Sequence, residues 1–234
     1  GKTLNAGQIC LAPDYVLIPE NKLEQFITNA KETVKDMFPR IKDNEDYTSV
    51  INERHYSRLT SYINEAKENG CEIIEINPAD EDFEQQEHYK IPPTLLINPD
   101  DDLKVMQEEI FGPILPIKTY KKFEETIDYV NKKDRPLGLY YFGRNQKELT
   151  TVLDKTTSGG VTVNDVIFHV AQENAPFGGV GPSGMGSYHG EEGFKNFSHA
   201  KTIFTQTKLD SIISVFRPPI GAKAKKALKD QIKP

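Results

Sequence analysis

The chain begins with two different spacings of apolar residues, one after the other. Residues 14–19 (DYVLIP) form a short apolar run, and in the following segment apolar residues recur every three or four positions. The first pattern predicts a strand, and the second predicts an amphipathic helix that begins at Asn21. A further helix with the same spacing is predicted to end at Gly70, and the apolar run 71–76 (CEIIEI) predicts the next strand.

The same alternation continues through the rest of the chain. Further strands are predicted at 94–97 (TLLI), 138–142 (GLYYF) and 159–164 (GGVTVN), and helices at 121–133 and 146–156. No repeat of fixed period is present. Strands and helices that alternate at this spacing predict an α/β fold, layered α/β/α, with a largely parallel sheet.

Charge and composition narrow the classes of partner. The chain has 29 Lys and Arg residues against 35 Asp and Glu residues, a net charge of −6, so a nucleic-acid-binding surface is not expected. No apolar run reaches the roughly 18 residues of a membrane-spanning helix, and no secretory leader precedes Cys10, so we expect a cytoplasmic protein. Basic residues gather only in the final segment, 217–234, which we interpret as a solvated tail and not as a membrane-surface site.

The two cysteines lie in different settings. Cys71 starts a predicted strand, which suits a small buried hydrophobic residue. Cys10 follows Asn5, Gly7 and Gln8, which provide polarity and close backbone access instead of apolar packing. A thiolate is reactive where nearby N–H groups or positive charge stabilise it. Composition alone leaves a nucleophile and a buried thiol both open for Cys10.

The histidines raise two other kinds of site. None of the five histidines has the HExxH spacing of a zinc site, so no metal is expected. His169 or His189 could act as a base for Cys10, oriented by Asn164 or Asn196, which would make the protein a cysteine hydrolase. A non-enzymatic assembly or binding module is the third possibility.

The glycine-rich segment 176–190 contains a GxGxxG pattern at Gly179, Gly181 and Gly184. A dinucleotide-binding fingerprint needs a strand before it, a helix that starts inside it and an acidic residue about 20 positions later. None of these is predicted here. We therefore interpret the segment as a tightly turning loop whose backbone approaches a ligand or another strand.

Taken together and in this order, three motifs resemble the C-terminal half of the aldehyde dehydrogenase superfamily. NAGQIC is similar to the nucleophile motif, EEIFGP to a second motif about a hundred residues later, and PFGGVGPSGMG to the glycine-rich loop that follows. Within that family, MQEEIFGPILPI and SGMGSYHGEEGFKNFSH are most similar to class 3 members, bacterial coniferyl aldehyde dehydrogenases among them.

The resemblance implies a mechanism and a role for each site residue. The Cys10 thiolate would add to an aldehyde and form a thiohemiacetal, which gives hydride to NAD or NADP and becomes a thioester that water hydrolyses. Glu109 would hydrogen-bond the ribose next to the nicotinamide, or abstract a proton, and Phe111 would pack beside the nicotinamide ring. The pocket for an aromatic or long-chain aldehyde would be lined by three residues: Ile167, Val170 and Phe177.

The resemblance also implies a domain organisation. Residues 1–205 correspond to a catalytic domain that lacks the N-terminal dinucleotide-binding domain, and residues 206–234 to a C-terminal tail. The general base and the second oxyanion donor would precede this chain, which we expect to be inactive by itself. The strand 159–164 corresponds to one at a subunit interface, so we expect a homodimer of the full-length enzyme.

Overall fold

The computed structural model describes residues 1–208 and 213–232. It divides into two units, Gly1–Phe197 and Ser198–Pro234. The six strands found among these described residues all belong to the first unit, which also contains the residues of the three motifs. Each unit is described by itself.

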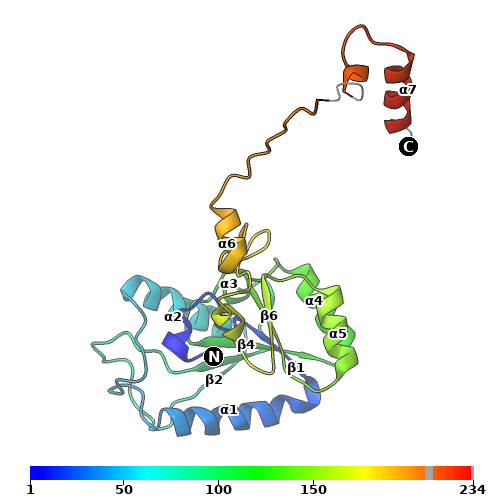
Figure 1. Cartoon of the computed structure of the whole chain (residues 1–234). Helices are drawn as coiled ribbons and strands as arrows, with labels where there is room; N and C mark the ends of the chain where they lie inside the picture. Colours follow the sequence, from blue (N-terminus) through cyan, green and yellow to red (C-terminus); the bar gives the residue numbers. More distant parts are fainter. Residues whose placement is uncertain (209–212, 233–234) are drawn as a thin grey trace. The chain divides into compact units, whose positions relative to one another are not determined.

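The strands form two sheets (Figure 1). The larger sheet has the order β1-β4-β3-β2, made of β1 (Val16–Pro19), β4 (Ile114–Tyr120), β3 (Thr94–Ile97) and β2 (Glu72–Glu75). β1 and β3 run parallel to β4, whereas β2 runs antiparallel to β3. The smaller sheet pairs β5 (Gly138–Tyr141) with β6 (Gly160–Val163) in parallel. The expected α/β class with largely parallel pairing is confirmed.

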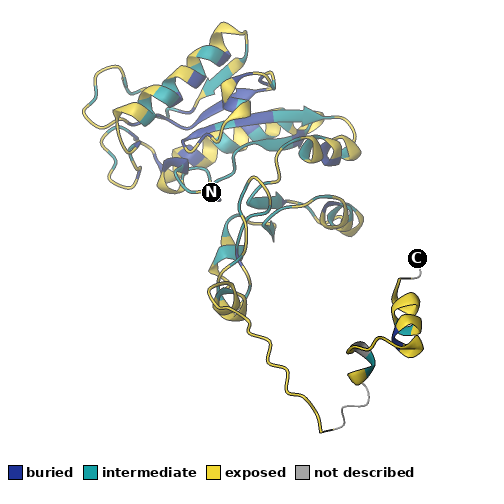
Figure 2. Ribbon diagram, turned by 90° about the horizontal axis from the view of Figure 1, so that it is seen from above, coloured by how far each residue is buried: buried dark blue, intermediate teal, exposed yellow. Residues whose placement is uncertain are grey.

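Helices cover both faces of the larger sheet. α1 (Leu23–Met37) places Ile27 and Val34 in one core with Leu95 and Ile97 of β3. α2 (Glu53–Glu68) forms a second core in which it packs against other sheet residues, Leu96 of β3 among them. Successive residues of a strand point to opposite faces, so β3 serves both cores and is buried along its whole length (Figure 2).

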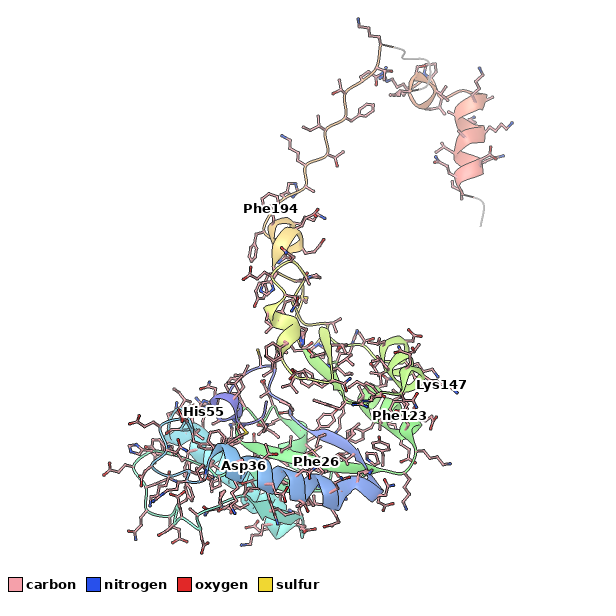
Figure 3. The ribbon with its side chains drawn as sticks, turned by 60° about the horizontal axis from the view of Figure 1, so that its bottom comes forward. Phe26, Asp36, His55, Phe123, Lys147 and Phe194 are labelled. Atoms are coloured by element: carbon pink, nitrogen blue, oxygen red, sulfur yellow. The ribbon has the colours of Figure 1, made fainter. Side chains whose placement is uncertain are left out.

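The amphipathic pattern of α1 is visible in its side chains. Phe26 packs against the first core, whereas Asp36 on the same helix is exposed (Figure 3). The smaller sheet has its own core, in which Tyr141 of β5 contacts residues of α4 (Phe123–Lys132) and α5 (Gln146–Lys155). Two short helices complete the first unit: α3 (Lys104–Gln107) and α6 (Gly190–Asn196).

The strand β4 was not predicted, although it lies between β1 and β3. Pro116 lies within it, opposite Leu96, and a proline inside a run usually argues against a central strand because it has no N–H to donate. Ile114 and Ile117 on either side are fully buried. Burying each isoleucine contributes about 1.5–3 kcal/mol, more than the roughly 1 kcal/mol of one missing ladder bond.

Two other expectations need adjustment. α1 begins at Leu23 and not at Asn21, because Glu20–Lys22 forms a 3₁₀ turn before it. Cys71 immediately precedes β2 and is half-buried instead of buried. Its Sγ lies 3.4 Å from the carbonyl oxygen of Ile97, and burial raises the pKa of the Cys71 thiol. Cys71 therefore has a packing role in the second core.

The second unit contains little regular structure among its described residues. Residues 198–208 are exposed and form neither helix nor strand. A 3₁₀ turn, Ser214–Phe216, contacts α7 (Ala222–Gln231), whose Ala224 is buried. Residues 209–212 and 233–234 of the expected tail lie outside the described residues. Nowhere in the described ranges is a helix long and apolar enough to cross a bilayer.

Asp101 links the larger sheet to α4, and this arrangement predicts a pH-dependent contribution to stability. Its Oδ1 accepts a 2.6 Å hydrogen bond from Tyr129 and lies 3.4 Å and 3.7 Å from the Nζ atoms of Lys118 and Lys133. Burial by itself would raise the pKa of Asp101, but these three partners hold it below its usual value. The stabilisation is therefore present above the unfolded pKa of about 4 and is lost as pH falls through the lower folded pKa.

We expect Asp101→Asn to lower the free energy of unfolding by about 1 kcal/mol at pH 7, a value reduced by the partial exposure of the carboxylate. The difference between variant and unaltered protein should shrink below about pH 4. Urea unfolding followed by circular dichroism at pH 7 and pH 3 measures both quantities. An equal difference at the two pH values would contradict the assignment.

Candidate active site

The segment before Cys10 has an unusual backbone. Asn5, Ala6 and Gly7 have φ values of 51°, 51° and 73°, three successive residues in the left-handed region. Asparagine and glycine tolerate this region, whereas alanine adopts it at a cost of about 1–2 kcal/mol. Ala6 is buried, which offsets part of that cost. Cys10 follows in a turn and is exposed.

Gly7 brings the first two motifs into contact. A Cβ atom added at Gly7 would clash with the carbonyl oxygen of Gly112, so only glycine fits there. Gly112 belongs to the segment 107–113, which also contains Glu109 and Phe111. The structure therefore places the Cys10 segment directly against the EEIFGP segment, about a hundred residues away along the chain.

Residues on both sides of Cys10 are tied to other elements. The Gln8 side chain donates to the Ser49 carbonyl and accepts from the Ile51 amide, both at 2.9 Å. The Leu11 carbonyl accepts a 2.6 Å hydrogen bond from the Tyr140 hydroxyl. Cys10 thus lies exposed in a segment whose neighbouring residues are held in place.

Glu109 and Phe111 lie on the surface, and Phe111 has a φ of 48°. A left-handed conformation costs a bulky residue about 1–3 kcal/mol, so the surrounding contacts must hold this backbone. Although Glu109 is exposed as a residue, partial burial of its carboxyl group and then the charge of Asp14 raise the pKa of Glu109. Burial lowers the pKa of Lys2 to about 8, although Asp14 and Glu109 both act to raise it. Lys2, Asp14 and Glu109 therefore form an electrostatically coupled group beside the two motifs.

The three residues expected to line an aldehyde pocket lie close to one another. Ile167 and Val170 are half-buried at the 3₁₀ turn Phe168–Ala171. Phe177 is buried, with its ring centroid 5.8 Å from that of His169 in the same turn. His169 thus connects Phe177 to the turn that carries Ile167 and Val170.

Sequence reasoning missed Tyr140, which links this turn to the nucleophile segment. Burial raises the pKa of the Tyr140 hydroxyl most. A hydrogen bond with the Ile167 backbone lowers this pKa, and the charge of the nearby Cys10 raises it. Together with the bond to Leu11, these interactions indicate that the Tyr140 hydroxyl lies near both Cys10 and Ile167. The sequence signal was weak, because in GLYYF the tyrosine looks like an ordinary strand residue.

The arrangement required for a cysteine hydrolase is not assembled. His169 Nδ1 is 2.8 Å from the Thr162 hydroxyl, and no hydrogen bond within residues 1–208 and 213–232 joins Cys10 Sγ to His169 or His189. Asn164 is used elsewhere, as its Oδ1 accepts from the Gly143 amide at 2.8 Å. The hydrolase hypothesis therefore lacks its catalytic pair.

Asn196, the other proposed orienting residue, lies beside Gly186 of the glycine-rich loop. A Cβ atom added at Gly186 would lie 2.8 Å from Asn196 Oδ1. That loop folds back on itself, with paired backbone bonds of 2.9 Å between Phe177 and Tyr188 and a bridge between Gly181 and Gly184. No helix begins inside the GxGxxG pattern, since α6 starts at Gly190. The interpretation as a tightly turning loop is confirmed.

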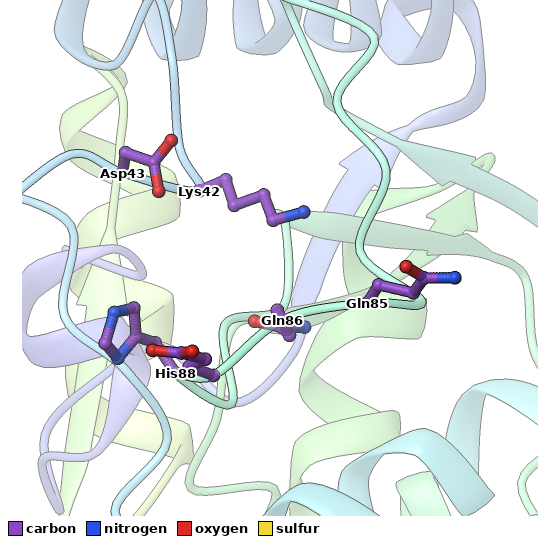
Figure 4. Close-up of a pocket in the computed structure, with 6 residues that line it drawn as sticks. Lys42, Asp43, Gln85, Gln86 and His88 are labelled. Atoms are coloured by element: carbon purple, nitrogen blue, oxygen red, sulfur yellow. The ribbon is translucent and has the colours of Figure 1, made fainter.

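Other candidate sites lie apart from these motifs. A hollow of about 430 Å³ is lined by Lys42, Asp43, Gln85, Gln86, Glu87 and His88 and includes none of the predicted site residues (Figure 4). Among the described residues, no group of three or more His, Cys, Asp or Glu side chains could hold a metal ion. The chemistry-bearing residues therefore remain those of the motif cluster around Cys10.

Comparison with known proteins agrees with this geometry. The chain is 60% identical over 234 residues to a Caulobacter vibrioides protein named "Probable coniferyl aldehyde dehydrogenase", covering all of this chain and 48% of that protein. The substrate-bound structure of Staphylococcus aureus AldH matches with a TM-score of 0.81 and 38% identity, over 99% of this chain and 49% of that one.

A betaine aldehyde dehydrogenase from Staphylococcus aureus in complex with NAD⁺ matches with a TM-score of 0.71 and 26% identity, over 82% of this chain and 38% of that one. The chain spans about half the length of the curated relatives it matches. A family model described as "Aldehyde dehydrogenase family" matches residues 1–203 of this chain. Because this match covers most of the chain, the chain belongs to the aldehyde dehydrogenase family.

Proposed function

We propose that the full-length protein oxidises an aromatic or long-chain aldehyde to the carboxylic acid with NAD or NADP, and that this chain supplies the nucleophile. One observation carries the proposal. The exposed Cys10 lies on a segment that packs, through Gly7 and Gly112, against the segment bearing Glu109 and Phe111. A nucleophile and two surface groups suited to a cofactor are thereby held together.

Cys10 is the group that reacts with the aldehyde. Its thiolate attacks the carbonyl carbon and gives a thiohemiacetal; loss of hydride converts this to a thioester, which water cleaves to release the acid and the thiol. The Cys10 amide N–H donates to no acceptor within the described ranges of the chain. It is therefore available to stabilise the developing oxyanion as one of two donors.

Glu109 and Phe111 are suited to hold the cofactor. The Glu109 carboxylate is at the surface, where it can accept hydrogen bonds from two ribose hydroxyls, and the Phe111 ring offers an exposed apolar face. When bound, a nicotinamide cofactor supplies the acceptor for the hydride. These two side chains orient it.

Three apolar side chains and the named relatives support the substrate class. Ile167, Val170 and Phe177 provide an apolar and aromatic lining near Tyr140, which suits an aromatic or long-chain aldehyde. A relative named for coniferyl aldehyde supports an aromatic substrate. We further propose a cytoplasmic homodimer, with residues 1–205 as the catalytic domain and 206–234 as a C-terminal tail.

The test is an assay of the full-length protein with coniferyl aldehyde and decanal, each with NAD⁺ and with NADP⁺. We expect reduced cofactor and the matching carboxylic acid to form in equal amounts. Iodoacetamide should label Cys10 before the half-buried Cys71, with activity lost in step, because a thiolate reacts where it is accessible. Absence of the acid, or labelling of Cys71 first, would contradict the proposal.

A further inference from the structure

Ile110 is fully buried between the two surface residues Glu109 and Phe111. Both polar groups of its backbone are bound by charged side chains from distant parts of the chain. Its amide donates to Asp14 Oδ1 at 3.0 Å, and its carbonyl accepts from Arg58 Nη2 at 2.7 Å. We call Asp14, Arg58 and Ile110 the Ile110 clamp.

Asp14 belongs to the nucleophile segment, four residues after Cys10 and just before β1. The hydrogen bond to Ile110 therefore joins the nucleophile segment to the Glu109 segment, in addition to the contact between Gly7 and Gly112. Asp14 is half-buried, so its oxygen has little competing water. The bond spans 96 positions of the chain.

Arg58, on α2, holds the same segment from the side of the second core. Its Nη1 donates to the Glu109 carbonyl at 3.2 Å and to the Tyr62 hydroxyl at 3.1 Å. The Tyr62 hydroxyl in turn donates to Glu108 Oε2 at 2.6 Å. Arg58 thus binds two successive carbonyls and is itself oriented by Tyr62, so the segment 108–110 is fixed to α2.

The clamp has a clear mechanical consequence. Phe111 follows Ile110 directly and has the left-handed φ of 48°, a conformation that a bulky residue keeps only when its surroundings impose it. The N–H and the C=O of Ile110 are both held by hydrogen bonds. The backbone directions of the neighbouring residues Glu109 and Phe111 are therefore fixed. The positions of these two side chains relative to Cys10 depend on the same bonds.

We propose that Asp14 is a positioning residue: through its hydrogen bond to the Ile110 amide it sets Glu109 and Phe111 at the correct position relative to Cys10. This inference rests on the proposed function, in which those two side chains hold the cofactor. For holding the Ile110 amide, the hydrogen-bonding oxygen of Asp14 is what matters; the negative charge of Asp14 acts separately, on the pKa of Glu109. Asparagine keeps that oxygen without the charge, whereas alanine removes both.

The test compares Asp14→Ala and Asp14→Asn in the full-length protein. For Asp14→Ala we expect the KM for the cofactor to rise about tenfold, the factor that one lost hydrogen bond typically carries. Hydrogen exchange of the peptide covering 108–113 should be faster by a similar factor, while the KM for the aldehyde changes less than about twofold. For Asp14→Asn, all three quantities should stay within about twofold of the unaltered protein.

Glu81→Ala is the matched control. Glu81 also binds distant backbone amides through a carboxylate, accepting from Ile41 at 2.6 Å and Lys42 at 3.1 Å, and it lies outside the site. This variant should lose stability and keep its cofactor KM. An equal rise in cofactor KM for Glu81→Ala would overturn a specific role of Asp14.

Two further results would overturn the inference: unchanged exchange of 108–113 in Asp14→Ala, or an Asp14→Asn variant as impaired as Asp14→Ala. The exchange measurement needs no turnover, so it tests the clamp separately. An unaltered protein without dehydrogenase activity would instead overturn the proposed function.

Discussion

Replacing Cys10 with alanine is expected to lower aldehyde oxidation by the full-length protein about 10³-fold or more. Without the sulfur no thiohemiacetal can form, and the carbonyl carbon has no hydride that it can readily release. Because Cys10 is exposed and its side chain makes no hydrogen bond within the described residues, the change should leave folding intact. Initial rates of cofactor reduction and a thermal unfolding curve measure the two effects.

Cys71→Ala is the matched control for this variant. Cys71 packs in the second core and contacts the Ile97 carbonyl, so its loss should cost stability of about 1 kcal/mol and leave the rate within about twofold. The two variants should therefore show opposite patterns. Full activity in Cys10→Ala, or a large loss of rate in Cys71→Ala, would contradict the assignment of the nucleophile.

Glu109→Gln is expected to raise the apparent KM for the cofactor, to slow the hydride step, or both. The two effects together should amount to about 10- to 100-fold. Glutamine keeps the size of the side chain but loses the charge that strengthens hydrogen bonds to two hydroxyls, worth about 1.5–3 kcal/mol. Thioester hydrolysis should change much less. Pre-steady-state kinetics separate these steps, because impaired hydride transfer reduces the burst of reduced cofactor.

The pH profile provides a second measurement on the same variant. Burial and the neighbouring Asp14 raise the pKa of Glu109, so the carboxylate form that binds hydroxyls is lost as pH falls through this raised value. The unaltered protein should show an acid limb above the ordinary glutamate pKa of about 4.3, and Glu109→Gln should not. A normal burst followed by slow turnover would instead make Glu109 the base for thioester hydrolysis.

Much of the fold could be predicted because its signals are local. The strand 94–97 occurs where the apolar run TLLI predicts it, and the helical spacing of apolar residues predicts α1 and α2 within a few residues. The prediction failed at β4, where Pro116 interrupts the pattern. Whether an irregular run becomes a central strand depends on neighbours on both sides, and these come from other parts of the chain.

The candidate site, too, has parts that the sequence predicts and parts that it does not. The motif containing Cys10 and the motif containing Glu109 and Phe111 could be identified from residue order, since each consists of consecutive residues. Their contact through Gly7 and Gly112, and the position of Tyr140, could not, because no local pattern records which loops meet. The hydrolase hypothesis was chemically reasonable from composition, but within the described residues neither His169 nor His189 is hydrogen-bonded to Cys10, and His169 Nδ1 is instead 2.8 Å from the Thr162 hydroxyl.

The sequence by itself determined the alternation of strands and helices, the α/β class and the motifs that identify the family, because periodicity and residue order are properties of the chain. Only the tertiary structure decided that Asp14 and Arg58 hold the Ile110 peptide from opposite ends. Such contacts form when segments far apart in sequence are brought together by burying the two cores around the sheet.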